Sequence, residues 1–405
     1  VDNIFRNYKE ERKIEVSANK FEENIIKRRV VNIKQIIFEV TQICNLRCKY
    51  CIYGNAFYNY RNHSTLQMPF EIALKGMQYI YDLTKRREDK ELFISIYGGE
   101  PLTNFQLIKR IVKESKKIFE NFNLRYSITT NGTMLIKKII DYLVLNNFSI
   151  QISLDGPEDM NDANRLFSDG KGTYAKVMFN IDKFKSYYKN YFFNKVGINS
   201  TFSWNLSLRK RYEFFIDTPV INKMRFDDSN VIDRNTTYYQ AKPINKSQIK
   251  KDIDYIFDNI INKLKQKIKL TPYEELFLNS IESVSRSLSI KKWNCKSGTC
   301  IFDSKVFIDA EGRFHVCERI DDKMPIGDVY IGFNYDKMEN IFNNFKRIIM
   351  ENCKNCCVRF FCHICYANIA SSGKFVLNND FCGSQKRAFK RRMEMYIRLK
   401  EGDLI

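Results

Sequence analysis

The chain has 405 residues, of which 44% are hydrophobic and 7 are proline, which excludes a disordered protein and predicts an ordered globular fold of two or three domains. It carries 67 basic and 47 acidic residues, has no run of eighteen apolar residues and shows no secretory signal pattern, so a cytoplasmic protein without a membrane partner is expected. Twelve cysteines in a reducing compartment favour metal or redox chemistry over disulfides.

The formal net charge of +20 leaves three interpretations open. Runs of basic residues occur at 27–29, 85–87, 386–387 and 390–392, and the last two lie on a predicted C-terminal helix. They indicate a solvated basic surface, a surface that attracts an acidic peptide, or a nucleic-acid site. No nucleic-acid-binding motif accompanies them, so no nucleic-acid partner is expected.

Strand and helix patterns alternate after residue 35, which predicts a parallel sheet with crossover helices. We expect six β/α units, two fewer than a closed eight-fold barrel, and therefore a partial (β/α)6 TIM-like barrel in the α/β class. In such barrels the chemistry lies at the C-terminal ends of the strands. The expected strands are 35–40, 91–97, 124–129, 148–154, 195–202 and 223–226, and the expected helices are 68–86, 104–119, 135–145 and 174–188.

Three cysteines follow the first predicted strand directly. Cys44, Cys48 and Cys51 are spaced Cys-x3-Cys-x2-Cys with no fourth cysteine nearby. Ferredoxin-type clusters use four cysteines, so a four-iron cluster held by these three leaves one iron open to a small molecule.

Polar motifs end the next three strands. Gly98 and Gly99 allow close backbone approach to a ligand, and the carboxylate that follows them in Gly98-Gly99-Glu100-Pro101 can accept from an ammonium group. The third strand ends near Asn131. Ser153 and Asp155 face one side of the fourth strand, where they can reach ribose hydroxyls. Ordinary turn chemistry is the alternative for each motif.

The cysteine loop and these motifs together resemble the radical S-adenosylmethionine (radical SAM) enzymes. The family places an aromatic residue, here Tyr50, just before the last cysteine. The resemblance implies that S-adenosylmethionine binds the open iron, that Glu100 takes its amino group, and that Arg165 contacts its carboxylate; a surface arginine is the alternative for Arg165. Many relatives carry a histidine where this chain has Asn161.

Residues 228–292 contain no cysteine, and they hold two amphipathic stretches at 247–268 and 272–288. We expect a helical bridge here. The expected domains are an N-terminal extension (1–34), the barrel (35–227), the bridge (228–292), a cysteine-rich domain (293–385) and a basic C-terminal helix (386–405).

Nine cysteines follow Trp293, and their spacing resembles the SPASM-type auxiliary-cluster domain of radical enzymes that modify peptides. The resemblance implies two auxiliary 4Fe-4S clusters, three in all, and leaves Cys357 as a free thiol or a replacement ligand. The spacing before Cys365 is one residue shorter than in the family. Two structural zinc sites, each held by four cysteines, are the alternative interpretation of the whole set. The implied ligands are Cys295, Cys300, Cys317 and Cys365 for the first auxiliary cluster, and Cys353, Cys356, Cys362 and Cys382 for the second.

A hairpin is predicted over 305–316, with its turn at 310–312, and it ends in Cys317-Glu318. In related maturases an acidic residue at this position acts as a base, so Glu318 is the candidate catalytic residue, with a surface carboxylate as the alternative. None of the histidines, His63, His315 and His363, is a favoured metal ligand.

These features predict a radical SAM oxidoreductase that crosslinks a ribosomally made precursor peptide through a thioether or carbon–carbon bond. An anaerobic sulfatase-maturating enzyme, which makes formylglycine, is the alternative, although Glu318 departs from the aspartate expected there. A metal-stabilised nucleic-acid-binding protein is the alternative outside enzymes. The expected partners are the precursor peptide and an electron donor such as flavodoxin or ferredoxin.

Overall fold

The computed structural model describes residues 22–54, 63–231, 237–239, 244–288, 303–362 and 364–405. Two predicted cluster ligands, Cys295 and Cys300, and His363 lie outside the described residues. Among the described residues, no helix combines the length and the apolar composition needed to cross a membrane.

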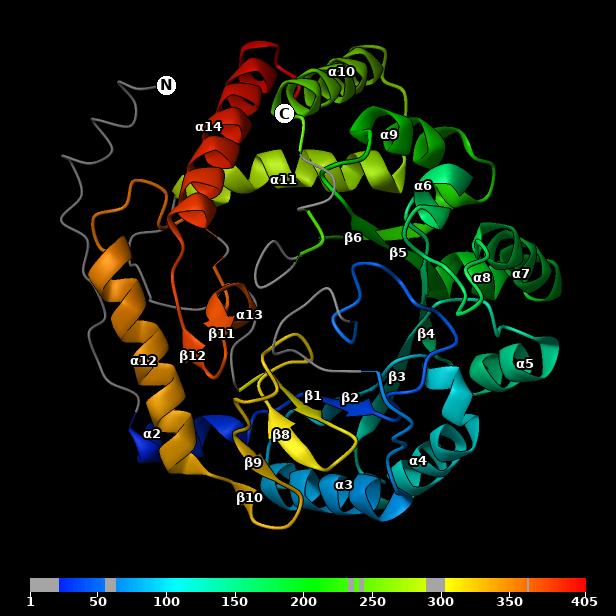
Figure 1. The fold of residues 1–405 in the computed structure, drawn as a ribbon, viewed down its shortest axis with the longest axis vertical. Coiled ribbons are helices and arrows are strands. Elements are labelled where there is room, and N and C mark those ends of the chain that lie inside the picture. The colour runs from blue at the N-terminus through cyan, green and yellow to red at the C-terminus, as the bar shows by residue number, and fades with distance from the viewer. Residues whose placement is uncertain (1–21, 55–62, 232–236, 240–243, 289–302, 363) are drawn as a thin grey trace.

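The six predicted parallel strands are confirmed. They lie side by side in chain order and all run in the same direction. Figure 1 shows them curving around one side of the molecule, with helices outside. The strands are β1 (Gln35–Glu39), β2 (Glu91–Tyr97), β3 (Asn123–Thr130), β4 (Ser149–Ser153), β5 (Val196–Phe202) and β6 (Arg225–Asn230). The helices between them are α3 (Phe70–Thr84), η1 (Pro101–Asn104), α4 (Phe105–Ile118), α5 (Lys137–Leu145), α6 (Glu158–Asp162), α7 (Tyr174–Tyr187), α8 (Lys189–Lys195) and α9 (Leu208–Asp217).

The sixth strand differs from its predicted position. The sequence pattern predicts it at 223–226, whereas β6 begins at Arg225 and continues to Asn230 through Asp227 and Asp228. Aspartate and asparagine are depleted in strands, so the local sequence pattern predicts that the strand ends before Asp227. Pairing with β5 over six residues overrides that preference.

The outer face of the barrel sheet is apolar, and its inner face mixes polar with apolar side chains. Outward residues such as Ile94, Ile128 and Ile198 are fully or almost fully buried against the helices. On the inner face, the hydroxyl of Ser95 lies 2.7 Å from that of Ser127 and accepts a hydrogen bond of 2.7 Å from Gln35. A closed eight-strand barrel fills its interior with branched apolar side chains. This six-strand barrel instead carries polar groups on its inner face beside Ile37 and Phe307, which share that face with Ser95.

The predicted hairpin is confirmed as β7 (Lys305–Ile308) and β8 (Arg313–His315). Its position was not predicted: β7 pairs in parallel with β1, so the sheet continues from the barrel into the cysteine-rich segment. Two short strands, β9 (Gly327–Asp328) and β10 (Gly332–Phe333), complete a sheet of ten strands. The pairing brings the Cys317-Glu318 segment to the first strand of the barrel.

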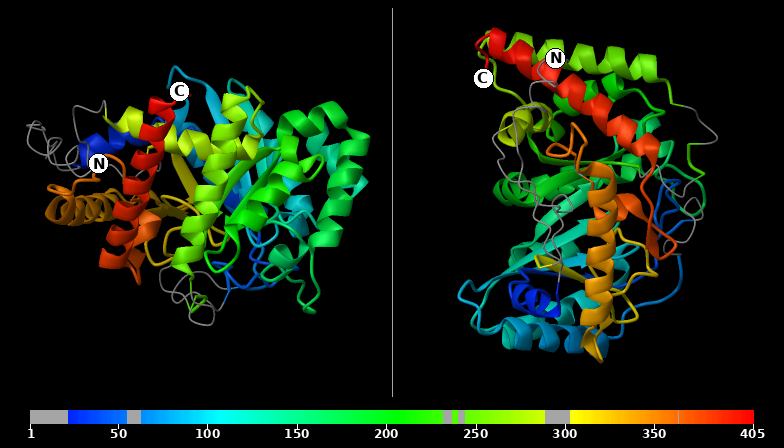
Figure 2. Two further views of the ribbon diagram at one scale, coloured as in Figure 1. Left: turned by 90° about the horizontal axis from the view of Figure 1, so that it is seen from above. Right: turned by 90° about the vertical axis from the view of Figure 1, so that its left-hand side faces the viewer.

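The remaining helices close the molecule into a ring (Figures 1 and 2). Two bridge helices, α10 (Lys246–Lys265) and α11 (Pro272–Leu288), occupy the two predicted amphipathic stretches. The predicted basic helix is confirmed as α14 (Asn379–Glu401), which starts seven residues earlier than expected because Asn378 caps it by accepting from the Asp380 amide. The other elements are α2 (Glu23–Val30), α12 (Tyr335–Cys353), α13 (Tyr366–Ile369), β11 (Ala370–Ser371) and β12 (Lys374–Phe375). The domain boundaries stay predictions.

Candidate functional site

The cysteine loop leaves the C-terminal end of β1 and is held by the segment that follows β4. The amide of Arg47 donates to the carbonyl of Leu166 at 2.8 Å, and the amide of Lys49 donates to that of Asn164 at 3.0 Å. Burial raises the pKa of Cys44 and of Cys51 to about 12, and it also raises the pKa of Cys48. The three thiols are half-buried, and binding of a metal cluster would have to release their protons.

The Gly98-Gly99 turn packs against this loop. A Cβ on Gly98 would lie 2.3 Å from the carbonyl oxygen of Thr41, and one on Gly99 would lie 2.4 Å from that of Ile43. The Gly99 amide donates to the Thr41 carbonyl at 2.8 Å. That these glycines admit a ligand stays a prediction; the structure shows that their lack of a side chain lets the chain's own cysteine loop pack closely.

Glu100 is completely buried between the ends of β2 and β3. One carboxylate oxygen accepts from the hydroxyl of Thr130 at 2.8 Å and the other from the amide of Asn131 at 2.7 Å. Burial raises the pKa of Glu100 despite these bonds. The Asn131 side chain donates to Asn45 at 2.8 Å and lies 4.0 Å from the Cys44 sulfur, so the third strand end also supports the cysteine loop.

Tyr50, Asp155 and Arg165 form one buried network. The Tyr50 hydroxyl donates to Asp155 and accepts from Arg165 at 2.9 Å. The second oxygen of Asp155 accepts from the amide of Thr201 at 3.0 Å, and burial raises the pKa of this carboxyl group. The sequence analysis left open whether Arg165 is a surface residue; it is only 7% exposed.

The Arg165 Nε is buried and has no hydrogen-bond acceptor among the described residues. A buried donor without a partner is costly, so a further acceptor is expected beside it. A carboxylate supplies one, and this fits the carboxylate of S-adenosylmethionine. Pro101 begins η1 at the same strand end, and Ser153 is half-buried at the end of β4 opposite Asn199.

Two residues that carried no predicted role support this site. Asn161 accepts from the amide of Asp155 at 3.3 Å and donates to Thr173 at 3.1 Å, which ties down the loop after β4. Arg211 of α9 is 1% exposed and donates to Ser200 at 2.9 Å and to Asp228 at 2.6 Å. No local sequence signal identifies Arg211, because its partners lie on β5 and β6.

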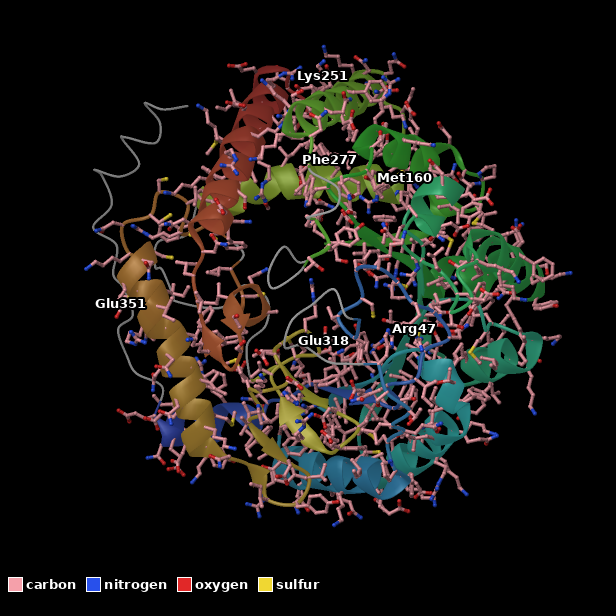
Figure 3. The ribbon with its side chains drawn as sticks, in the orientation of Figure 1. Arg47, Met160, Lys251, Phe277, Glu318 and Glu351 are labelled. Carbon is pink, nitrogen blue, oxygen red and sulfur yellow. The ribbon has the colours of Figure 1, made fainter. Side chains whose placement is uncertain are left out.

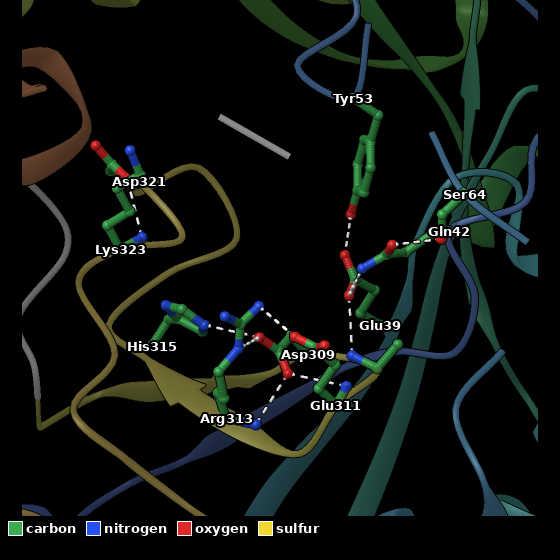
Figure 4. Close-up of polar contacts among 11 residues, drawn as sticks. Glu39, Gln42, Tyr53, Ser64, Asp309, Glu311, Arg313, His315, Asp321 and Lys323 are labelled. Carbon is green, nitrogen blue, oxygen red and sulfur yellow. Dashed lines mark hydrogen bonds and ion pairs between the residues drawn. The ribbon is translucent and has the colours of Figure 1, made fainter. Parts of the chain in front are cut away.

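A polar cavity of about 330 Å³ lies where β1 meets the hairpin (Figure 4). Glu39 is buried there, accepts from the Tyr53 hydroxyl, and accepts from the Ala310 amide at 2.9 Å. Asp309, at the hairpin turn, lies 3.0 Å from His315 Nε2 and accepts from Arg313 Nε at 2.7 Å. Burial opposes its charge, but His315 and Arg313 lower the pKa of Asp309 to about 2.

Glu318 pairs with Lys305 at 3.0 Å, and both side chains are largely buried. Burial opposes ionisation, but the Lys305 ammonium group outweighs it and lowers the pKa of Glu318. Figure 3 shows Glu318 on the inner side of the ring and Glu351 of α12 on the outer side. The catalytic role of Glu318 stays a prediction.

The four cysteines predicted for the second auxiliary cluster line one cavity. Cys353, Cys356, Cys362 and Cys382 come from the end of α12, the following loop and the first turn of α14. Burial raises the pKa of Cys362 to about 11. Cys357 does not line this cavity, and it packs instead with the apolar cluster around Phe361 and Phe389.

The first auxiliary set is described only in part. Cys317 is buried beyond β8, and the Cys365 thiol donates to Asn368 at the start of α13 at 2.8 Å. Across the described ranges, no group of three His, Cys, Asp or Glu side chains is arranged to hold a single metal ion.

Residues 38–201 match the model of the Radical SAM superfamily, so the barrel is a radical SAM domain. The radical SAM cyclopropyl synthase TigE of Paramaledivibacter caminithermalis is 28% identical over 242 residues, which cover 57% of this chain and 45% of that protein. A cysteine-type anaerobic sulfatase-maturating enzyme of Clostridium perfringens (strain 13 / Type A) is 24% identical over 325 residues, covering 77% and 83%. The chain spans about half the length of the first curated relatives it matches.

Among solved structures, native anSMEcpe with bound AdoMet superposes with a TM-score of 0.68 at 19% identity, covering 91% of this chain and 99% of that chain. This likeness shows the fold. The chain therefore carries a radical SAM domain and is related both to sulfatase-maturating enzymes and to TigE.

Proposed function

We propose that this protein is a radical SAM peptide maturase that oxidatively crosslinks a precursor peptide through a thioether or carbon–carbon bond. The observation that carries the proposal is the shared cavity of Cys353, Cys356, Cys362 and Cys382, in the same molecule as the Cys44-Cys48-Cys51 loop. In oxidative chemistry, a second metal centre would accept an electron from the substrate. A substrate that loses a hydrogen atom and then a proton must also give up one electron.

When bound, the cluster and S-adenosylmethionine supply a 5'-deoxyadenosyl radical that removes a hydrogen atom from the substrate. The chain's own residues orient the cofactor. Arg165 offers its free Nε to a carboxylate, and Tyr50 and Asp155 fix the guanidinium group. Glu100 offers its buried carboxylate to the amino group, and Ser153 lies where a ribose hydroxyl is expected.

We infer that the peptide enters along the inner face of the barrel, which carries both polar and apolar side chains. The Gln35, Ser95 and Ser127 side chains offer hydrogen bonds there to a polar backbone. Glu318 lies on the inner side of the ring, 3.0 Å from the ammonium group of Lys305. These features support Glu318 as the group that takes the substrate's proton.

Anaerobic sulfatase maturation is the second candidate. It is favoured by the length of the match, since the similarity to the Clostridium perfringens enzyme covers 83% of that protein. Glu318, where an aspartate is expected, and the similarity to TigE favour crosslinking.

The test is anaerobic reconstitution followed by two measurements. We expect about twelve irons per chain, and 5'-deoxyadenosine after addition of dithionite and S-adenosylmethionine. The matched control, Cys48→Ala, should keep about eight irons and make no 5'-deoxyadenosine. Protein that binds only zinc and leaves the cofactor intact would refute the proposal. Candidate peptides then separate the two activities, because a crosslink removes about two hydrogens whereas formylglycine replaces a cysteine or serine by an aldehyde.

A further inference from the structure

A short piece of the chain between β6 and α10 packs against the cysteine loop. Residues 237–239 belong to this piece, which lies in the predicted bridge. The ring of Tyr238 meets the ring of Tyr50 edge to face, with the two centroids 6.3 Å apart. Cys48 and Val231 belong to the same small apolar cluster. The bridge therefore contributes a side chain directly beside the cysteine loop.

Asn164, in the loop after β4, is held from two sides. Its side-chain oxygen Oδ1 accepts a hydrogen bond of 2.7 Å from the Tyr238 hydroxyl. Its backbone carbonyl accepts a hydrogen bond of 3.0 Å from the amide of Lys49, the residue that follows Cys48. Asn164 is only 4% exposed. The residue is thus fixed between the bridge and the cysteine loop.

The bond from Tyr238 leaves the nitrogen of the Asn164 amide as its free end. This nitrogen, Nδ2, is buried and has no hydrogen-bond acceptor among the described residues. The same holds for Nε of Arg165, the next residue along the chain. A buried donor without an acceptor is costly, so both donors point to a bound group that offers acceptors to them.

The side chains of Asn164 and Arg165 reach the same pair of aromatic rings. Arg165 donates to the Tyr50 hydroxyl at 2.9 Å, Asn164 accepts from Tyr238, and these two tyrosine rings are in contact. A carboxylate suits the two free donors, because each of its two oxygens accepts hydrogen bonds. A cluster sulfur is a weaker acceptor, and the positive charge of Arg165 favours an anion.

We propose that Asn164 is a further binding residue for S-adenosylmethionine, which donates from Nδ2 to the cofactor's carboxylate beside Arg165, and that Tyr238 positions it. The inference rests on the proposed function, since it requires this cofactor at the cysteine loop. The Tyr238 hydroxyl fixes the orientation of the amide. Without that bond the amide can turn over and present its oxygen, which would repel the carboxylate.

The test compares two ligands by anaerobic calorimetry on the whole chain with reconstituted clusters. Decarboxylated S-adenosylmethionine lacks the carboxylate but keeps the amino and sulfonium groups, so its Kd divided by that of S-adenosylmethionine measures the contribution of the carboxylate. The variants are Asn164→Ala, Tyr238→Phe and the two combined. The matched control is Tyr239→Phe, which removes the hydroxyl of the adjacent tyrosine, whose oxygen accepts from the Trp204 amide at 3.3 Å.

We expect Asn164→Ala to lower this Kd ratio by about tenfold or more, because a hydrogen bond to a charged group is lost. Tyr238→Phe should lower it by about threefold or more, and Tyr239→Phe should leave it within about twofold. Because Tyr238 acts through Asn164, the double variant should match Asn164→Ala. Tyr238→Phe keeps the ring against Tyr50, so it tests the proposal even if Asn164→Ala fails to fold.

An unchanged Kd ratio in Asn164→Ala, or equal ratios in Tyr238→Phe and Tyr239→Phe, would overturn the proposal. An unchanged ratio together with an altered electron paramagnetic resonance spectrum of the reduced cluster, recorded before the cofactor is added, would assign Nδ2 to a cluster sulfur instead. An effect of Tyr238→Phe that persists in the Asn164→Ala background would refute the positioning role of Tyr238.

Failure of the proposed function is a separate result, measured on the wild type with candidate peptides. If the variants change the Kd ratio as expected but the wild type modifies no peptide, the proposed function fails and the role of Asn164 stands. If the wild type crosslinks a peptide but Asn164→Ala leaves the ratio unchanged, the reverse holds. A reconstituted wild type that does not bind S-adenosylmethionine would overturn both.

Discussion

The Gly99→Ala substitution tests whether the glycine turn exists to hold the cysteine loop. The added Cβ would lie 2.4 Å from the Ile43 carbonyl oxygen and 2.8 Å from that of Gln42. An ordinary contact begins at 3.4 Å, so the loop backbone must move by about 1 Å. That movement strains the 2.8 Å bond from the Glu100 amide to the same Ile43 carbonyl.

The expected cost combines two effects. Overpacking a tight contact costs about 1–3 kcal/mol, and a weakened backbone hydrogen bond adds about 1 kcal/mol. We therefore expect the free energy of unfolding to fall by about 2–4 kcal/mol. Because the shifted residues lead into Cys44, the reconstituted variant should also contain about four fewer irons than the wild type.

The assay is anaerobic denaturant unfolding of the cluster-free protein, with iron analysis after reconstitution. Gly383→Ala in α14 is the matched control, because its Cβ would meet only the flexible end of Arg387, at 3.2 Å. Alanine replaces glycine within a helix there, so the control should gain up to about 1 kcal/mol. A Gly99→Ala protein with wild-type stability and full iron would refute the reasoning.

Four further substitutions test other parts of the site. Tyr50→Phe removes the hydroxyl that accepts a hydrogen bond from Arg165. Calorimetry should show weaker binding of S-adenosylmethionine, and the free energy of unfolding should fall by about 1–3 kcal/mol. An unchanged affinity and an unchanged free energy of unfolding would contradict the network. Asp309 has a pKa lowered to about 2, so its stabilisation is present above about pH 4 and is lost as the pH falls towards 2. Unfolding of Asp309→Asn across this range should therefore show about 2 kcal/mol less pH dependence than the wild type, whereas an identical pH profile would refute the assignment. Cys356→Ala should lose about four irons and Cys357→Ala none, and equal losses would show that Cys357 is a ligand.

Local sequence patterns predicted the elements that depend on local order. The strand and helix periods located the six β/α units, and the second bridge helix has the predicted bounds, 272–288. The motifs at the strand ends were also found, because parallel strands bring their C-terminal ends to one edge of the sheet. Tyr50, Asp155 and Arg165 were named individually, but the hydrogen bonds that join them were not predicted.

Local sequence patterns did not predict the contacts between segments that lie far apart in the chain. Nothing in the β7 pattern identifies β1 as its partner, since a short apolar strand pairs equally well with many others. In the sequence, Arg211 is one more charge on an amphipathic helix. Only the fold brings Ser200 and Asp228 within hydrogen-bond distance of it. The contact of the Gly98-Gly99 turn with the cysteine loop, which lies more than fifty residues earlier, was not predicted.

The sequence by itself determined which metal-binding side chains this protein offers: three closely spaced cysteines after the first strand, and nine more after Trp293. Four of these nine, which the family spacing groups together, line one cavity, and the spacing did not place the neighbouring Cys357. Only the tertiary structure shows that Cys356 lines the cavity and Cys357 does not, although both pack against the cluster of Phe361 and Phe389. Adjacent residues in a loop point in different directions, and the packing of α14 against that loop decides which thiol faces the cavity.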